Sequence, residues 1–186
     1  MRRSLDLLYD GAGVLAALFL VAIVAVVLIQ VGFNILDSLA LAFGAAPPGF
    51  VLPSYAEFTG YFLAAASFLA AAHTLRRGAM IRVSLVLQRL GGETRRWVEV
   101  WCAAAGAVFA AYATYWMTLL VLESLEFGDV SPGMIAVPLW IPQTSLALGL
   151  AIMTVALIDG TAEAWRGRYL LADASEDVAD SHGGEV

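Results

Sequence analysis

The stretch VLAALFLVAIVAVVLI, residues 14–29, is an uninterrupted run of apolar side chains in a chain of 186 residues. It lies within a longer window, residues 11–36, that contains no Asp, Glu, Lys or Arg. A helix that crosses a bilayer needs about 20 mostly apolar residues, whereas a strand of a membrane β-barrel alternates apolar and polar residues. Because the stretch is long and does not alternate, it predicts a transmembrane helix.

Three further windows, residues 58–75, 100–122 and 130–158, also lack charged side chains. The whole chain is 61% hydrophobic and 14% charged, whereas a soluble domain carries roughly a quarter charged residues. We therefore expect an all-α integral membrane protein with one membrane domain over residues 1–170. Its four transmembrane helices are predicted near residues 11–33, 54–75, 98–121 and 141–164.

The basic residues are distributed very unevenly. All ten are arginines, and with four spans they all fall on one side of the membrane. The connectors at residues 34–53 and 122–140 contain neither Lys nor Arg. Since basic residues near the ends of spans are retained in the cytoplasm, we expect both termini and the connector at residues 76–97 to be cytoplasmic.

The connector between the second and third spans has a helical pattern of its own. Four apolar residues recur at i, i+3, i+4 and i+7, namely Val83, Val86, Leu87 and Leu90. Arg82 and Arg89 project together from another face of the same helix. This pattern predicts an amphipathic helix at about residues 80–90 that lies in the membrane interface, with its arginines among anionic lipid headgroups.

Further residues are expected to anchor the chain at the cytoplasmic interface, because arginines set topology and tryptophans gather at headgroup level. With membrane lipids as their partners, the predicted anchoring and topology residues are Arg76, Arg77, Arg82, Arg89, Arg95, Arg96, Trp97 and Trp165. Residues 171–186 hold five acidic residues and no basic one. This composition predicts a disordered cytoplasmic tail.

A few polar or aromatic residues near the opposite ends of the spans are candidate subunit contacts. Gln30 and Asn34 lie one turn apart, and amides in membranes hydrogen-bond across helices. Glu57 is an intramembrane carboxylate, a residue type that often marks an ion pathway. Its place near the outer end of its helix favours a subunit contact over a proton relay, and Trp140 lies at the same interface.

The sequence offers little for catalysis. Cys102 is the only cysteine, and His73 is the only histidine outside the tail. A haem in a helix bundle needs paired axial ligands from facing helices, which one histidine does not provide. We expect no enzyme activity, no catalytic or metal-binding residue, no cofactor and no nucleic-acid partner.

Long stretches of the chain resemble a known family. PSYAEFTGYFLAAASFLAAAHTLRRGAMIRVSLVLQRL (residues 53–90), TRRWVEV (94–100) and GDVSPGMIAVPLWIPQTSLALG (128–149) are similar to the small permease subunit, DctQ, of tripartite ATP-independent periplasmic (TRAP) transporters. Glu57 matches the acidic residue that the family has at the start of its second span. The chain departs from the family's pattern at Met80, where His is frequent, and at Ser84, where Asp is frequent.

The resemblance implies a location in the bacterial inner membrane and two protein partners. One is a large multispan permease subunit, which the small subunit scaffolds and anchors, and the other is a periplasmic substrate-binding protein that delivers an organic acid. Uptake would be driven by an ion gradient. Two alternatives stay open at this point: an autonomous small ion-coupled transporter that uses Glu57, and the membrane anchor of a redox complex.

Overall fold

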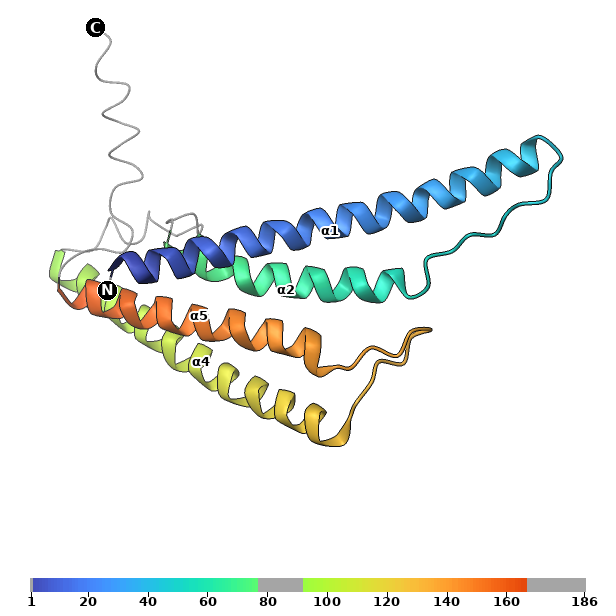
Figure 1. Cartoon of the computed structure of the whole chain (residues 1–186). Helices are drawn as coiled ribbons and strands as arrows, with labels where there is room; N and C mark the ends of the chain where they lie inside the picture. Colours follow the sequence, from blue (N-terminus) through green and yellow to red (C-terminus); the bar gives the residue numbers. More distant parts are fainter. Residues whose placement is uncertain (1, 77–91, 167–186) are drawn as a thin grey trace, which may run out of the picture.

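The computed structural model describes residues 2–76 and 92–166 (Figure 1). They form the helices α1 (Arg2–Ala42), α2 (Tyr55–Arg76), α4 (Gly92–Phe127) and α5 (Trp140–Trp165). Each of the four is long and apolar enough to cross a membrane. Within the described residues this confirms the helical architecture and the four helices of spanning length. The predicted interfacial helix at about residues 80–90 and the tail at 171–186 lie outside the described residues.

The first helix is longer than its predicted span. That span was predicted to end near residue 33, yet α1 continues without a break to Ala42. The polar residues after the span are compatible with a helix because their side chains are bonded locally or to the following loop: Ser38 Oγ donates to the Asn34 carbonyl at 2.8 Å, and Asp37 Oδ1 accepts from the Gly49 amide at 3.0 Å. The chain leaves the helix just before Gly44, whose φ of +72° is readily adopted by glycine.

The helices form a row in the order α1, α2, α5, α4. α2 lies between α1 and α5, and α5 in turn packs on α4. Figure 1 shows the four helices close together at the end that holds the N-terminus and spread apart at the other end, where α1 extends well beyond α2. The arrangement is thus a layer about one helix thick along most of its length.

Small side chains hold the converging end together. Ala72 and Ala156, which have no exposed surface, pack with Tyr9 and Leu75 where α1, α2 and α5 meet. A second buried cluster, between α1 and α2, consists of Ala12, Ala16, Ala66 and Leu69. Such residues let helix backbones approach closely, which is how helices associate in membranes in the absence of a hydrophobic driving force.

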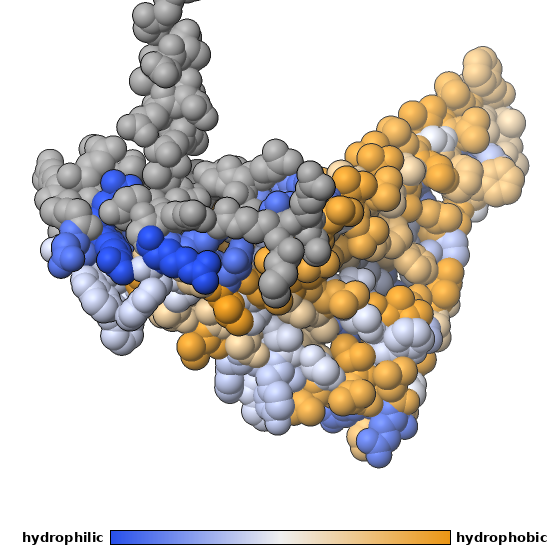
Figure 2. Space-filling view, turned by 60° about the vertical axis from the view of Figure 1, so that its left-hand side comes forward, coloured by the Kyte–Doolittle hydropathy of each residue, from blue (hydrophilic) through white to orange (hydrophobic). Residues whose placement is uncertain are grey.

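Most of the apolar surface stays outside this core. Only 11% of the most apolar window of α1, of α4 and of α5 is buried, and 28% of that of α2. Figure 2 shows hydrophobic residues along the part of α1 that extends away from the other helices, while hydrophilic residues gather at the converging end. An exposed apolar surface of this extent fits a protein surrounded by lipid or by other membrane proteins.

Candidate membrane and subunit contacts

The converging end collects several of the predicted anchoring residues. Arg95 Nε donates to Glu99 Oε1 at 3.1 Å, one turn further along α4. Arg96 donates to the main-chain carbonyl of Trp165, and the rings of Trp97 and Trp165 meet edge to face with centroids 5.6 Å apart. The contacts of Arg96 and Trp97 join the first turns of α4 to the last turn of α5.

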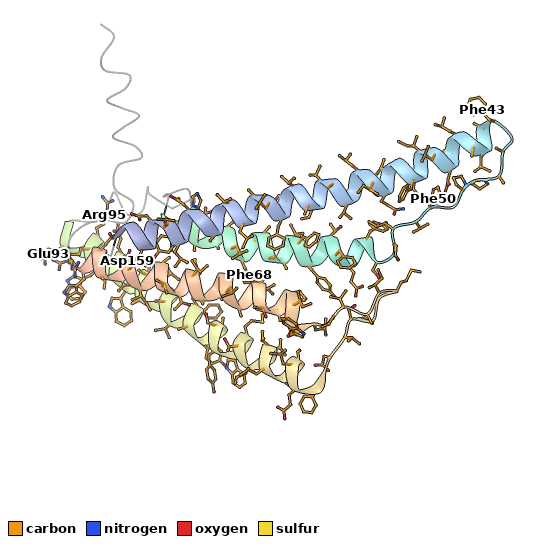
Figure 3. The ribbon with its side chains drawn as sticks, in the orientation of Figure 1. Phe43, Phe50, Phe68, Glu93, Arg95 and Asp159 are labelled. Carbon is orange, nitrogen blue, oxygen red and sulfur yellow. The ribbon has the colours of Figure 1, made fainter. Side chains whose placement is uncertain are left out.

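Charged residues of both helices lie at this end, as Figure 3 shows for Glu93, Arg95 and Asp159. Arg76 is the last residue of α2. Of the remaining predicted anchors, Arg77, Arg82 and Arg89 lie outside the described residues. The side chains placed by the structure thus link α4 to α5 at the end that carries the arginines.

The side chain of Gln30 makes its hydrogen bonds within the chain. It is 8% exposed, and its Oε1 accepts a hydrogen bond from the Leu52 amide at 3.0 Å. Its Nε2 donates to Asn34 Oδ1 at 3.4 Å on the same helix. Where the amides were expected to bond across helices, Gln30 instead ties α1 to the loop that leads into α2.

Glu57 points into the loop between α4 and α5. Its Oε1 accepts from the Tyr61 hydroxyl at 3.3 Å, and its carboxylate lies so close to Gly133 that a Cβ there would be 2.7 Å from Glu57 Cδ. Beside it, Ser54 Oγ accepts from the Ile135 amide at 3.1 Å. The start of α2 and this loop therefore form one packed unit.

The four candidate subunit contacts do not gather at one place. Gln30 and Asn34 lie on α1 beside the first loop, and Glu57 lies under the second loop. Trp140 is the first residue of α5 and is 38% exposed. Among the residues that the structure describes, no group of three or more His, Cys, Asp or Glu side chains could hold a metal ion.

Several contacts were missed by the sequence analysis because they depend on how the helices are rotated. Thr114 Oγ1 on α4 lies 3.1 Å from Thr154 Oγ1 on α5. His73 Nδ1 on α2 lies 3.2 Å from the Tyr9 carbonyl oxygen and 3.4 Å from Asp10 Oδ1 on α1. A polar residue within an apolar span was the only signal for either contact, and it did not specify a partner.

Two apolar grooves flank the contact between α4 and α5. The first lies over α5 between α2 and α4, and its lining residues are Phe68, Ala71, Gly106, Phe109, Ala110, Ala113, Leu150, Met153 and Leu157. The second lies nearer the arginine-bearing end, and its lining residues are Ala104, Ala107, Val108, Ile158, Thr161, Ala162, Trp165 and Arg166. Helical spacing places the two sets on opposite sides of α4. We name them the central groove and the arginine-end groove.

These features define a class of protein: an integral membrane protein whose described polar side chains bond within their own helix or tie its helices and loops together, with extensive apolar surface left exposed. Comparison with known families is more specific. Residues 49–167 match the model described as tripartite ATP-independent periplasmic transporters, DctQ component, and the chain belongs to this family. It is a family of transporter components. No curated protein and no solved structure matches the chain in the same comparison.

Proposed function

We propose that this chain is the subunit that scaffolds and anchors the large permease of a TRAP-type secondary transporter in the bacterial inner membrane. The large permease carries the substrate and coupling-ion sites, and a periplasmic binding protein delivers an organic acid. The observation that carries this proposal is the DctQ match over residues 49–167, which includes α2, α4 and α5. Both termini are cytoplasmic in this proposal, because four spans assign all ten basic residues of the sequence to the same side of the membrane.

The thin layer of helices supports a scaffolding role. In this row, α1 and α4 each contact essentially one neighbouring helix. Both faces of the layer are therefore open to other membrane proteins. A transporter that worked alone would need a polar pathway enclosed by its own helices. The row instead presents broad apolar faces that a larger membrane protein can cover.

The central groove is the place where we propose that a helix of the large permease packs. Its floor consists of Leu150, Met153 and Leu157 on α5, and its walls include Phe68 on α2 and Phe109 on α4. In membranes, close side-chain packing drives helix association. A concave apolar surface bounded by two helices offers such packing to a third.

The first experiment is to tag the chain, solubilise native membranes in a mild detergent and identify the co-purifying proteins by mass spectrometry. We expect a multispan permease in stoichiometric amount. Recovery of this chain alone, from a preparation that preserves other membrane complexes, would contradict the proposal. An autonomous transporter would then have to be tested through Glu57→Gln.

The groove has its own test. Ala113→Trp fills the central groove, because Ala113 lines it. Ala111→Trp is the matched control, because Ala111 is an exposed residue of α4 that lies outside the lining. We expect the first substitution to reduce the amount of co-purified permease and the second to leave it unchanged. Equal yields for both variants would place the contact elsewhere.

A further inference from the structure

We propose that the arginine-end groove binds one anionic phospholipid of the leaflet on the arginine-bearing side. Its headgroup phosphate is held by Arg166, and an acyl chain lies between α4 and α5. The groove takes no part in the contact proposed for the large permease, because its residues lie on the other side of α4 from the central groove.

The shape and lining of the groove suit an acyl chain. Ala104, Ala107 and Ala162 have side chains of a single methyl group, so the surface between the two helices is hollowed, while Val108 and Ile158 border it toward the membrane interior. The hydroxyl of Thr161 donates to the Leu157 carbonyl at 2.8 Å and leaves its methyl group for the groove. From Ile158 to Arg166 the groove runs about 12 Å along α5, at 1.5 Å per residue. It therefore holds the part of one acyl chain that is nearest the headgroup.

The polar end of the groove suits a phosphate. Arg166 belongs to the lining, and Trp165 beside it packs against Trp97. Tryptophan pairs of this kind sit at headgroup level, and basic pockets between helices on the cytoplasmic side recognise anionic headgroups. The arginine is thus at the depth where a phosphate lies, and the alanines are at the depth where acyl chains lie.

The acidic residues near this end lie outside the groove lining. Glu99 is paired with Arg95 on another face of α4. Asp159 and Glu163 lie on the same side of α5 as Arg166, two turns and one turn before it, but neither lines the groove. Glu93 shares the groove side of α4 and is exposed, but it lies at the start of that helix, beyond the arginine. Among the described residues that line the groove, Arg166 is the one that carries a charge, so it is the group that we propose meets the headgroup.

The test measures lipid binding to the purified full-length protein, with its partners retained, by native mass spectrometry. Phosphatidylglycerol is titrated against phosphatidylcholine with the same acyl chains. We expect a preference for phosphatidylglycerol that falls about fivefold in Arg166→Gln, since one arginine near the membrane surface contributes about that factor, and that is kept in Arg166→Lys. An unchanged preference in Arg166→Gln would overturn the assignment of the headgroup.

A second variant separates the acyl chain from the headgroup. Ala162→Phe fills the groove from an exposed position, so the substitution disturbs no buried contact of the fold. We expect this variant to bind neither phosphatidylglycerol nor phosphatidylcholine at this site. Ala105→Phe is the control here, because Ala105 is an exposed residue of α4 that lies outside the groove lining and off the row formed by Ala104 and Ala107. Retention of lipid by Ala162→Phe at the level of this control would overturn the site.

The occupant is identified directly with a photo-crosslinking benzoyl-phenylalanine at position 162, irradiated in native membranes. An adduct with the mass of a phospholipid supports the proposal. An adduct to another protein would show that a subunit fills the groove, and release of bound phosphatidylglycerol by inorganic phosphate would show a simple anion site. Either result would overturn the proposal.

Discussion

Gly149 on α5 lies directly against the backbone of Phe68 on α2. A Cβ added at Gly149 would be 2.7 Å from both the carbonyl carbon and the Cβ of Phe68, closer than real carbon atoms approach. Because the atoms it would meet are largely backbone, a rotamer change cannot relieve the clash. The contact between the two inner helices of the row depends on the absence of a side chain at this position.

Gly149→Ala is therefore expected to push α2 and α5 apart. Overpacking of a close contact costs about 1–3 kcal/mol, and thermal unfolding in a fixed detergent should show it as a lower Tm. Gly60→Ala is the control, because nothing lies within 4 Å of a Cβ at Gly60. If both variants unfolded at the wild-type temperature, the close approach of α5 to Phe68 would be wrong.

The hydroxyl contact between Thr114 on α4 and Thr154 on α5 should contribute only modestly to the free energy of unfolding. Each hydroxyl also lies within hydrogen-bond distance of a carbonyl one turn back, that of Ala110 for Thr114 and that of Leu150 for Thr154. Either hydroxyl therefore has an acceptor when the other is removed. We expect a double-mutant cycle with Thr114→Val and Thr154→Val to give a coupling energy of about 0.6 kcal/mol, the usual value for such bonds in membranes. A coupling near zero would indicate that the two hydroxyls do not interact.

The bond from Leu52 to Gln30 fixes the first loop to α1. Replacing Gln30 by Leu leaves the Leu52 amide without its acceptor, at a cost of about 1 kcal/mol. The sharpest measurement is hydrogen exchange at the Leu52 amide, which we expect to be faster in Gln30→Leu and unchanged in Ser38→Ala. Ser38 bonds only its own helix, so it serves as the matched control.

The number and type of spans could be predicted from the sequence because the bilayer imposes one requirement on all of them, a long window without charge. The helix boundaries were predicted less closely, since the first span was expected to end near residue 33 and the connector to cover residues 34–53. The side chains of Asp37 and Ser38, which lie in that range, have bonds that accommodate the continuing helix. A polar residue after a span shows where the hydrocarbon ends. It does not show where the helix ends.

The order of the helices could not be predicted, for a related reason. In an alanine-rich sequence many positions permit close packing, and only a few are used. Gly60 on α2 is exposed, whereas Gly149 on α5 lies against the backbone of Phe68. Which small residue is buried depends on the rotation of each helix, and a single sequence does not carry that information.

The proposed orientation rests on arginines and can be tested through them. Replacing Arg76, Arg77, Arg82 and Arg89 together by Glu removes the basic residues of the connector between α2 and α4, and we expect loss of the native topology or of assembly, because basic residues hold such connectors in the cytoplasm. Reporter fusions at the C-terminus and after residue 90 measure the topology. Arg to Lys at the same four positions should leave it intact, and wild-type topology and complex yield in the Glu variant would refute the role of these residues.

Substitutions at Glu57 and Gly133 are expected to have non-additive effects on stability. Gly133→Ala places a methyl group against the carboxylate of Glu57, and the Ser54 hydroxyl, 2.9 Å from the same Cβ position, leaves little room on the other side. The substitution should displace the loop between α4 and α5 from the start of α2, with a cost of about 1–3 kcal/mol. Glu57→Ala removes the obstructing carboxylate, so the double variant should be destabilised by less than the sum of the two single changes. Additive losses of stability in thermal unfolding would mean that the carboxylate does not pack on Gly133, and would return Glu57 to the set of side chains free to meet a partner.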